Sequence, residues 1–488
     1  MTHPMNNSHE EHLPHGEERD EDAIFTTLEC DEIITANHKD KYHTNRLCWN
    51  RAINAFPRVI TYCKTVEHVR KCIAFAREHA LPIRIRSGAH SYEGFSTGDE
   101  VMIIDVSRMK SIELDMQKLE ARIGAGVQNI EIFTALKDKG LIAVGGACPT
   151  VGVCGFVMGG GWSFSSRYFG LGCDSVIEFE IVDYEGNLLT VNSESHPELF
   201  WACRGAGAGN FGICVSMKLK VYNTFDRATL ITLNYPNCCE KKIVSKIKAW
   251  QNFFKTCDLR FNGKINIYNC SKDGIGFNFL IVFYGGADEA HSLLQPLLND
   301  CCPEYEPSIT AVKYPDSSID LSMQESSVYN TLKTICDIHP DYESFKSTGG
   351  FMSRDLETEE IQNLIEIVKR KATGCTYTAF SIYGLEGNIR KVPHDSTAFP
   401  YRQAQQMIGL QTQWEDEQYA KENKEWLVDT IFKHILPITD GFFTNFPLIE
   451  LKDYRKQYYG REEWRQEKLS KVKYQYDPLR IFSHSQGV

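Results

Sequence analysis

Three glycine-rich segments between residues 86 and 212 constrain the fold most strongly, because each exposes backbone that can approach a bulky ligand. The first, RSGAHSYEG at 86–94, follows an alternating strand at 83–86 and breaks into Ser87, Gly88 and Ala89. Small residues in such a loop can curl their backbone N–H groups around an anionic diphosphate. Taken alone, however, a short Gly/Ser turn after a strand more often only reverses the chain.

The second segment, GACPTVGVCG at 146–155, continues into GGG at 159–161, so that backbone can approach a planar ligand over some fifteen residues. Cys148 stands among these glycines, where a cysteine is more often a small buried hydrophobe than a nucleophile. The third segment, RGAGAGNFG at 204–212, leads into an alternating strand near 213–222. It is the combination of the three that favours a ligand.

In their order along the chain, these motifs resemble those of the berberine-bridge-enzyme-like group in the vanillyl-alcohol-oxidase superfamily of FAD-linked oxidases. The resemblance runs from about residue 45 to the C-terminus and implies an α+β, two-domain protein: an FAD-binding fold of the p-cresol-methylhydroxylase (PCMH) type and an antiparallel-sheet substrate domain covered by helices. The matching segments are RSGGH-x-Y (here 86–92, with Ala89), G-x-CPTVGVGG (146–155), GGG plus an aromatic (159–162), LFWA-x-RG-x-G-x-GNFG (199–212) and a closing region with Asn445-Phe-Pro, DYRKQYYG (453–460) and YDP-x-x-x-F (476–482).

The resemblance implies FAD attached at two points, with His90 on the flavin 8-methyl carbon and Cys148 on the neighbouring C6. Cys154 replaces a glycine of the family pattern, and we expect it to pack against its loop, with a linkage through Cys154 as the less favoured alternative. The expected FAD-contacting residues are His90, Cys148, Arg86, Ser87, Gly88, Ala89, Ser91, Val151, Gly152, Gly155, Gly160, Gly209, Asn210, Gly212, Ile213 and Asn445.

We expect four regions: a flexible acidic tail at 1–40, an FAD-binding domain at 41–222, a substrate-binding domain at 223–438, and a closing segment at 439–488 that returns to the FAD domain. Local patterns predict a helix near 66–79 opened by Thr65, a hairpin around the turn at 184–187, strands near 229–235, 263–270, 275–284 and 375–384, and helical stretches at 240–256 and 412–435.

The catalytic base is where the sequence departs from the family. Many relatives carry a tyrosine directly after the asparagine that matches Asn445, but this chain has Phe446, which cannot accept a proton. The Lys-x-Gln pair of plant relatives is replaced by Met407 and Gly409. Replacement candidates that could face the pocket are Tyr92, Tyr383 and Gln411, with Gln413 less favoured. Tyr92 could equally be a packing aromatic, and the Tyr383 hydroxyl could equally point to solvent.

Val151 matches a position where oxidases of the family tend to carry valine and dehydrogenases a bulkier residue, which favours O2 as the electron acceptor. We therefore expect an oxidase that takes hydride from a small alcohol, sugar or amine and releases H2O2. Two alternatives stay open: a flavin dehydrogenase with another acceptor, and a flavin-binding protein without turnover. A nicotinamide-dependent reductase of the superfamily is less favoured.

Composition narrows the remaining choices. The net charge of −11 argues against nucleic acid or an anionic membrane as a partner, and the polar N-terminus is unlike a signal peptide. Seventeen cysteines without a secretion signal predict reduced thiols and a cytoplasmic location. His9 and His12 are spaced i, i+3 before a proline, which does not suit a metalloprotease helix, so no metal is expected.

Overall fold

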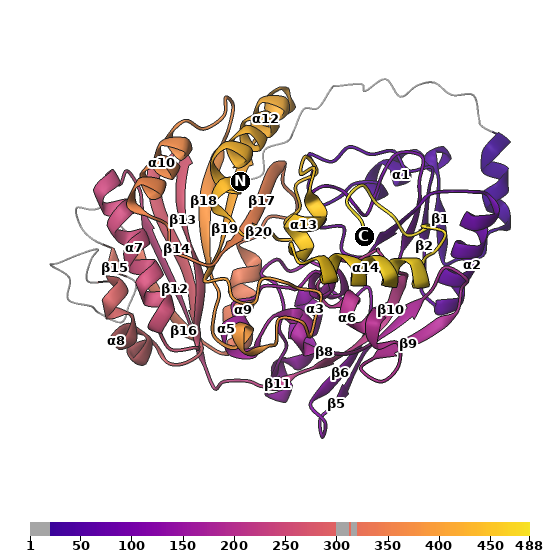
Figure 1. The fold of residues 1–488 in the computed structure, drawn as a ribbon, viewed down its shortest axis with the longest axis horizontal. Coiled ribbons are helices and arrows are strands. Elements are labelled where there is room, and N and C mark those ends of the chain that lie inside the picture. The colour runs from indigo at the N-terminus through magenta and orange to yellow at the C-terminus, as the bar shows by residue number, and fades with distance from the viewer. Residues whose placement is uncertain (1–19, 299–311, 314–319) are drawn as a thin grey trace.

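The computed structural model describes residues 20–298, 312–313 and 320–488. Its largest element is a nine-stranded antiparallel sheet of order β15-β16-β12-β14-β13-β18-β19-β17-β20. Figure 1 shows α7, α8, α10 and α12 on the outer side of this sheet and the N-terminal part of the chain beyond its other side. This arrangement confirms the predicted α+β class with a helix-covered antiparallel sheet.

The strands of the large sheet are β12 Ala228–Tyr235, β13 Phe261–Cys270, β14 Gly274–Phe283, β15 Val312–Lys313, β16 Asp320–Ser326, β17 Phe345–Met352, β18 Tyr377–Gly384, β19 Gln406–Gln413 and β20 Gly441–Phe442. The helices of this part are α7 Glu240–Thr256, α8 Ala287–Leu298, α9 Val328–Asp337, α10 Thr358–Lys369, α11 Asn388–Lys391 and α12 Ala420–Thr430.

The N-terminal part contains two further sheets, of order β1-β2-β4-β3 and β5-β6-β10-β8-β9, and a small pair β11-β7. Its strands are β1 Glu32–Ile34, β2 Val59–Tyr62, β3 Ile83–Arg86, β4 Met102–Asp105, β5 Ile112–Asp115, β6 Glu120–Gly124, β7 Leu141–Ile142, β8 Val176–Val182, β9 Leu188–Asn192, β10 Ile213–Lys220 and β11 Tyr222–Asn223. Its helices are α1 Asp40–Asn45, α2 Val66–Glu78, α3 Asn129–Leu136, α4 Val153–Met158, α5 Ser166–Phe169 and α6 Pro197–Cys203.

The closing helices α13 Tyr454–Tyr459 and α14 Glu463–Tyr476 follow β20 and lie over the N-terminal part, where α14 contacts α6 (Figure 1). Lys473 of α14 donates to the carbonyl of Asn210 at 2.6 Å, and the backbone N–H of Val488 donates to the Asn210 side chain at 3.1 Å. The chain therefore leaves the large sheet at Phe442, four residues beyond the boundary that we placed at 438, and ends against the third glycine-rich segment.

Several local predictions are confirmed. Thr65 caps α2 by accepting a hydrogen bond from the His68 backbone N–H. The predicted hairpin is the β8/β9 pair. The predicted helix at 412–435 is wrong at its start, because Thr412 and Gln413 still pair with β18 and β17 as the end of β19. The helix begins only at α12.

The predicted tail at 1–40 also extends too far. Residues 1–19, which include His9 and His12, lie outside the described residues, as do two of the seventeen cysteines, Cys301 and Cys302. From residue 20 onward the chain is structured: β1 pairs with β2, and the side chains of Phe25, Leu28 and Ile34 are buried. The free energy gained by burying these apolar side chains offsets the conformational entropy that this segment loses when it becomes ordered.

The two faces of the nine-stranded sheet differ in chemistry. One face carries buried Ile265, Phe279, Phe380 and Leu410 and packs under the outer helices. Alternation along each strand puts polar side chains on the opposite face, toward the N-terminal part. The register aligns them across the sheet as Lys264, Asn266, Tyr268, Asn278, Tyr377, Ser381, Tyr383 and Gln411.

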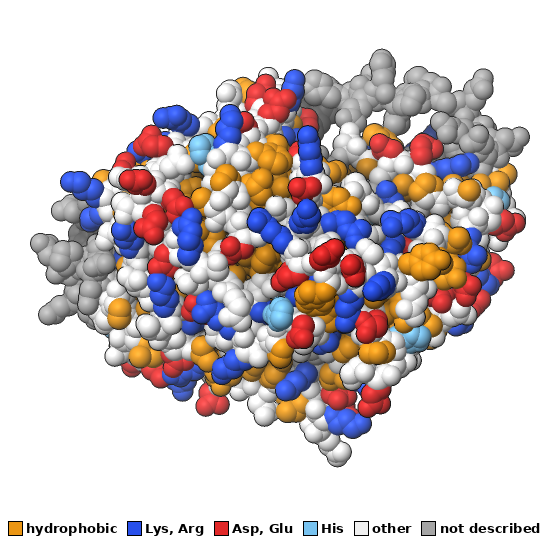
Figure 2. Space-filling view, in the orientation of Figure 1, with side chains coloured by type: hydrophobic (Ala, Val, Ile, Leu, Met, Phe, Trp, Pro, Cys, Tyr) orange, Lys and Arg blue, Asp and Glu red, His pale blue; other side chains and the backbone are white. Residues whose placement is uncertain are grey.

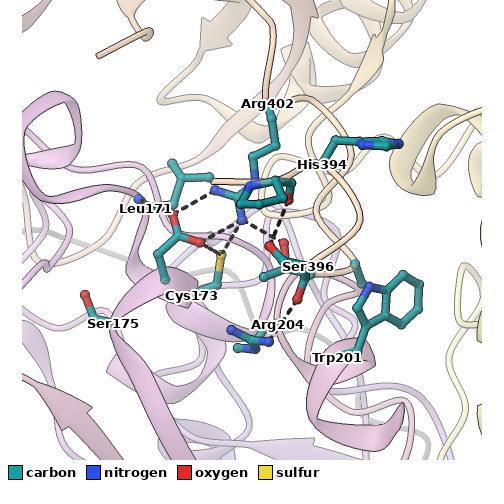
Figure 3. A network of polar contacts seen from close by, with 12 residues as sticks. Leu171, Cys173, Ser175, Trp201, Arg204, His394, Ser396 and Arg402 are labelled. Carbon is teal, nitrogen blue, oxygen red and sulfur yellow. Dashed lines mark hydrogen bonds and ion pairs between the residues drawn. The ribbon is translucent and has the colours of Figure 1, made fainter. Parts of the chain in front are cut away.

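A buried polar network fastens the two halves together, as Figure 3 shows. Arg402, in the loop before β19, forms a two-pronged ion pair with Asp174 of the N-terminal part, with both N–O distances 2.7 Å. Trp201 and Arg204 donate to backbone carbonyls of the same loop at 2.7 and 2.9 Å. Arg465 of α14 donates to further carbonyls there. These contacts join the N-terminal part and α14 to the loop that precedes β19 of the large sheet.

The outer surface carries both charge signs. Figure 2 shows lysine and arginine side chains intermixed with acidic ones over the visible face, with small apolar areas between them. Among the described residues, no helix combines the length and the hydropathy needed to cross a bilayer.

Candidate functional site

The first two glycine-rich loops touch each other. A Cβ on Gly88 would lie 2.4 Å from the backbone nitrogen of Gly152, so only glycine permits this approach. The contact brings His90 and Cys148 together although they are 58 residues apart: their Nε2 and Sγ atoms lie 4.0 Å from each other. Thr150 contacts both, at 2.7 Å from His90 Nε2 and 3.8 Å from Cys148 Sγ. The two residues expected to hold the flavin are therefore neighbours.

Burial keeps the His90 imidazole neutral near pH 7. Burial lowers the pKa of His90 to about 4, and nearby His339 adds to this. The Thr150 hydroxyl shares a hydrogen bond with Nε2, and Nδ1 has no partner among the described residues. Burial raises the pKa of the Cys148 thiol, although the Thr150 hydroxyl and the backbone N–H groups of Thr150 and Val151 oppose that rise. An unprotonated ring nitrogen thus lies beside a protonated thiol.

The first loop has the form of an anion cradle. Ala89 adopts a left-handed φ of 56°, which costs about 1 kcal/mol for a residue with a Cβ. Within the described part of the chain, the backbone N–H groups of residues 88–91 donate no hydrogen bond. Successive N–H groups around a left-handed residue form a concave site for anions. The strained backbone at Ala89 and the free N–H groups of residues 88–91 together suit a diphosphate group such as that of FAD.

The second loop leaves room for the same ligand. A Cβ built on Gly155 would meet no protein atom within 4 Å, although the neighbouring Cys154 is buried. Cys154 lies on α4 with its Sγ 3.7 Å from the Met158 sulfur, away from His90, as expected for a packing residue. The cradle, the open glycine and the His90–Cys148 pair together fit FAD, which would be held by the loops at 86–94 and 146–156.

Other residues that we predicted to contact FAD instead make contacts that hold these loops in place. The Arg86 guanidinium forms an ion pair with Asp105 and donates to the Asn45 carbonyl, so it anchors the start of the first loop. Asn445 donates to the Phe156 carbonyl at 2.9 Å and lies so close to Gly159 that a Cβ there would clash with it at 1.7 Å. Ser87 donates a hydrogen bond to the Ala125 carbonyl, and the Asn210 side chain donates to the Ala206 carbonyl. The backbone has a positive φ at Gly160, Gly209 and Gly212, and Gly212 precedes Ile213, the first residue of β10.

Aromatic rings pack around His90 and Tyr92, next to the cradle. Tyr92 lies parallel to Phe446, with centroids 5.2 Å apart, and edge-on to Phe345 at 4.8 Å. Trp49 stacks on the His90 imidazole at 5.1 Å and also contacts Phe345. Sequence reasoning missed Trp49 and Phe345, because neither lies in a glycine motif and their contacts join segments almost 300 residues apart.

The three candidates for the base lie on this side of the molecule. Tyr92 is in the first loop, Tyr383 contacts Phe446 at 6.1 Å, and Gln411 shares the polar face of the large sheet with Tyr383. Burial raises the pKa of Tyr383 to about 12 and that of Tyr92 further still. Both phenols are therefore neutral near pH 7 and suit hydrogen-bond donation better than proton abstraction.

Two charged residues that sequence reasoning missed complete the site. Glu343 precedes β17, and burial raises its pKa to about 7, with Lys264 opposing the rise. Lys264 of β13 has a pKa lowered by burial, with Glu343 opposing. Neither residue belongs to a recognisable motif; a lysine within a predicted strand, FNGKINIYN, was the one available signal.

Comparisons with known proteins agree with this site. Residues 57–192 match the family model described as FAD binding domain, and residues 442–488 match that described as Berberine and berberine like. An uncharacterized FAD-linked oxidoreductase, YgaK of Bacillus subtilis, is 29% identical over 467 residues, which is 93% of this chain and 96% of that protein.

Solved structures share the fold. BBE-like 1 of Physcomitrella patens superposes with a TM-score of 0.84 at 21% identity, over 96% of this chain and 98% of that one. The carbohydrate oxidase from Microdochium nivale gives a TM-score of 0.83 at 20% identity with the same coverage. These likenesses confirm the predicted two-part FAD-binding fold. These matches confirm the predicted resemblance to berberine-bridge-enzyme-like FAD-linked oxidoreductases.

Proposed function

We propose that this protein is an oxidase that holds FAD covalently through both His90 and Cys148. The observation that carries the proposal is the 4.0 Å separation of these side chains beside the unmet N–H groups of residues 88–91. Bound FAD supplies a two-electron acceptor whose N5 takes hydride from a substrate carbon. The protein's own residues bind and orient the substrate and take up its proton.

The substrate that we propose is a small alcohol or sugar, in preference to an amine. Substrate hydroxyl groups can pair with the Tyr383 hydroxyl and the Gln411 amide, which belong to the polar sheet face and keep accessible surface. The rings of Tyr92 and Phe446 offer an apolar wall for C–H faces. The similar fold of a carbohydrate oxidase supports this choice.

We propose O2 as the electron acceptor, with H2O2 as the product. Support comes from Val151, whose short side chain keeps accessible surface beside Cys148. No described cysteine forms a disulfide, which supports the cytoplasmic location that we propose. A small substrate and O2 are then the partners required.

The experiment is anaerobic mixing of the holoprotein with aldoses, primary alcohols and amines while the flavin absorbance is followed. We expect an aldose or alcohol to bleach the flavin and admitted air to restore it with one H2O2 per flavin. Bleaching that air does not reverse within minutes would identify a dehydrogenase. Bleaching by dithionite alone would identify a flavin-binding protein without turnover.

A further inference from the structure

Glu343 is fixed at the edge of the site by its backbone. Its N–H donates to the Trp49 carbonyl at 3.2 Å, and its own carbonyl accepts from the Arg51 N–H at 2.8 Å. This bridge ties Glu343 to the segment whose indole stacks on His90. Because side chains alternate along an extended chain, Glu343 lies on the same face as Phe345, whose ring contacts Tyr92.

Lys264 approaches the same space from the large sheet. It is opposite Tyr383 in the β13–β18 register, and its Nζ lies 6.0 Å from the centre of the Tyr383 ring. Both Lys264 and Glu343 keep accessible surface. Among the described residues, neither the Lys264 ammonium nor the Glu343 carboxyl makes a hydrogen bond or an ion pair. Two partly buried charged groups without a protein partner among the described residues are costly for a fold, so they indicate a function.

The other titratable groups around Glu343 compete poorly for a proton. His90 is neutral near pH 7, and Tyr92 and Tyr383 are neutral phenols. His339, after α9, has its Nδ1 on the Ile335 carbonyl at 2.8 Å and a pKa lowered mainly by burial, with Lys264 also lowering it. The nearby Arg51 guanidinium instead donates to the Cys48 carbonyl and lies over the Tyr342 ring.

We propose that Glu343 is the catalytic base of the oxidation and that Lys264 is a positioning residue that keeps its carboxylate charged. This assignment rests on the proposed oxidase function. The Glu343 carboxylate takes the proton of the substrate O–H group as that bond breaks. The neighbouring C–H bond breaks with its electron pair, its hydrogen leaves as hydride to the flavin, and a C=O bond forms.

The pKa of Glu343, about 7, supports this role, since a base works best when its pKa lies near the working pH. Burial is the main cause of the shift, and the Lys264 charge limits it. The base would then lie two residues before β17 rather than at position 446, where many relatives carry a tyrosine.

The test compares Glu343→Gln with wild type and with Glu386→Gln. Glu386 is a matched control, because burial also raises its pKa but its carboxyl pairs with Arg390 at 3.0 Å, away from this cluster. The substrate is the aldose or alcohol that bleaches the wild-type flavin fastest. We expect Glu343→Gln to slow anaerobic bleaching at least 100-fold, to remove the rise of that rate through about pH 7, and to keep wild-type flavin content. Glu386→Gln should behave as wild type.

Two further readouts separate chemistry from structure. Infrared difference spectra between pH 5 and pH 9 should contain a protonated-carboxyl band that Glu343→Gln removes and Glu386→Gln retains. Lys264→Met should move the inflection of the bleaching rate to higher pH, because the charge that favours the carboxylate is gone. Acetate should restore part of the rate to Glu343→Ala, which lacks the carboxyl.

The outcomes distinguish the two proposals. If no compound bleaches the wild-type flavin, the proposed oxidase function fails and the base assignment with it. If wild type is bleached and Glu343→Gln matches it in rate and pH profile, the function stands and the assignment of Glu343 is overturned.

Discussion

The rings of Tyr92 and Phe446 lie parallel within 1°, with centroids 5.2 Å apart. Gly349 of β17 makes room for this stack, because a Cβ there would come within 3.2 Å of the Phe446 ring. Position 446, where many relatives carry a tyrosine, is therefore part of the aromatic wall in this chain.

Phe446→Tyr should have little effect on the chemical step. The new phenol would be buried beside Tyr92, and burial would keep it protonated near pH 7. We expect the anaerobic bleaching rate to change by less than about threefold, in contrast to the loss expected for Glu343→Gln. A rise of tenfold or more, with a new dependence on pH, would return the role of base to this position.

Glu343→Gln should also alter stability in a pH-dependent way. The folded-state pKa of Glu343, about 7, lies above that of a glutamate in the unfolded chain, so its contribution to stability is complete below about pH 4.3 and is lost as pH rises through about 7. Relative to wild type, the variant should therefore gain roughly 1–3 kcal/mol between pH 5 and pH 8 in urea unfolding. An unchanged difference between the two pH values would show that the carboxyl is solvated as in water.

The sequence predicted the local elements because a cap such as Thr65 acts on its own neighbours. The pairing of His90 with Cys148 was implied by the resemblance of their two motifs to the family. The sequence could not predict Glu343 and Lys264 as a pair, since their proximity arises from the packing of the large sheet against the N-terminal part. The folded structure of residues 25–34 was missed for a similar reason: the tail predicted from the polar N-terminus included Phe25, Leu28 and Ile34, whose side chains are buried by packing against distant residues.

Arg402→Met should destabilise the protein strongly. The substitution leaves Asp174 as a buried carboxylate without its guanidinium partner, which costs about 3–5 kcal/mol. Arg354→Met is the matched control, since Arg354 makes a two-pronged pair with Glu360 at the surface and should lose no more than about 1 kcal/mol. Chemical denaturation of both variants gives the comparison, and equal losses would mean that the Arg402 network does not hold the two halves together.

Val151→Leu should slow the reaction of the reduced flavin with O2. A larger side chain beside Cys148 would narrow access to the flavin while leaving the polar sheet face untouched. We expect stopped-flow mixing with air-saturated buffer to give reoxidation at least tenfold slower, with unchanged anaerobic bleaching. Equal reoxidation rates would remove Val151 from the account of the electron acceptor.

The most direct test of the central claim is the intact mass of the denatured holoprotein, measured for wild type, His90→Ala, Cys148→Ala, the double variant and Cys154→Ala. Cys154 is the matched control, because its thiol packs on Met158. The account predicts one FAD per chain after denaturation in wild type, in each single variant at 90 or 148 and in Cys154→Ala, and none in the double variant. A wild-type protein of full flavin content that releases all of its FAD on denaturation would contradict it.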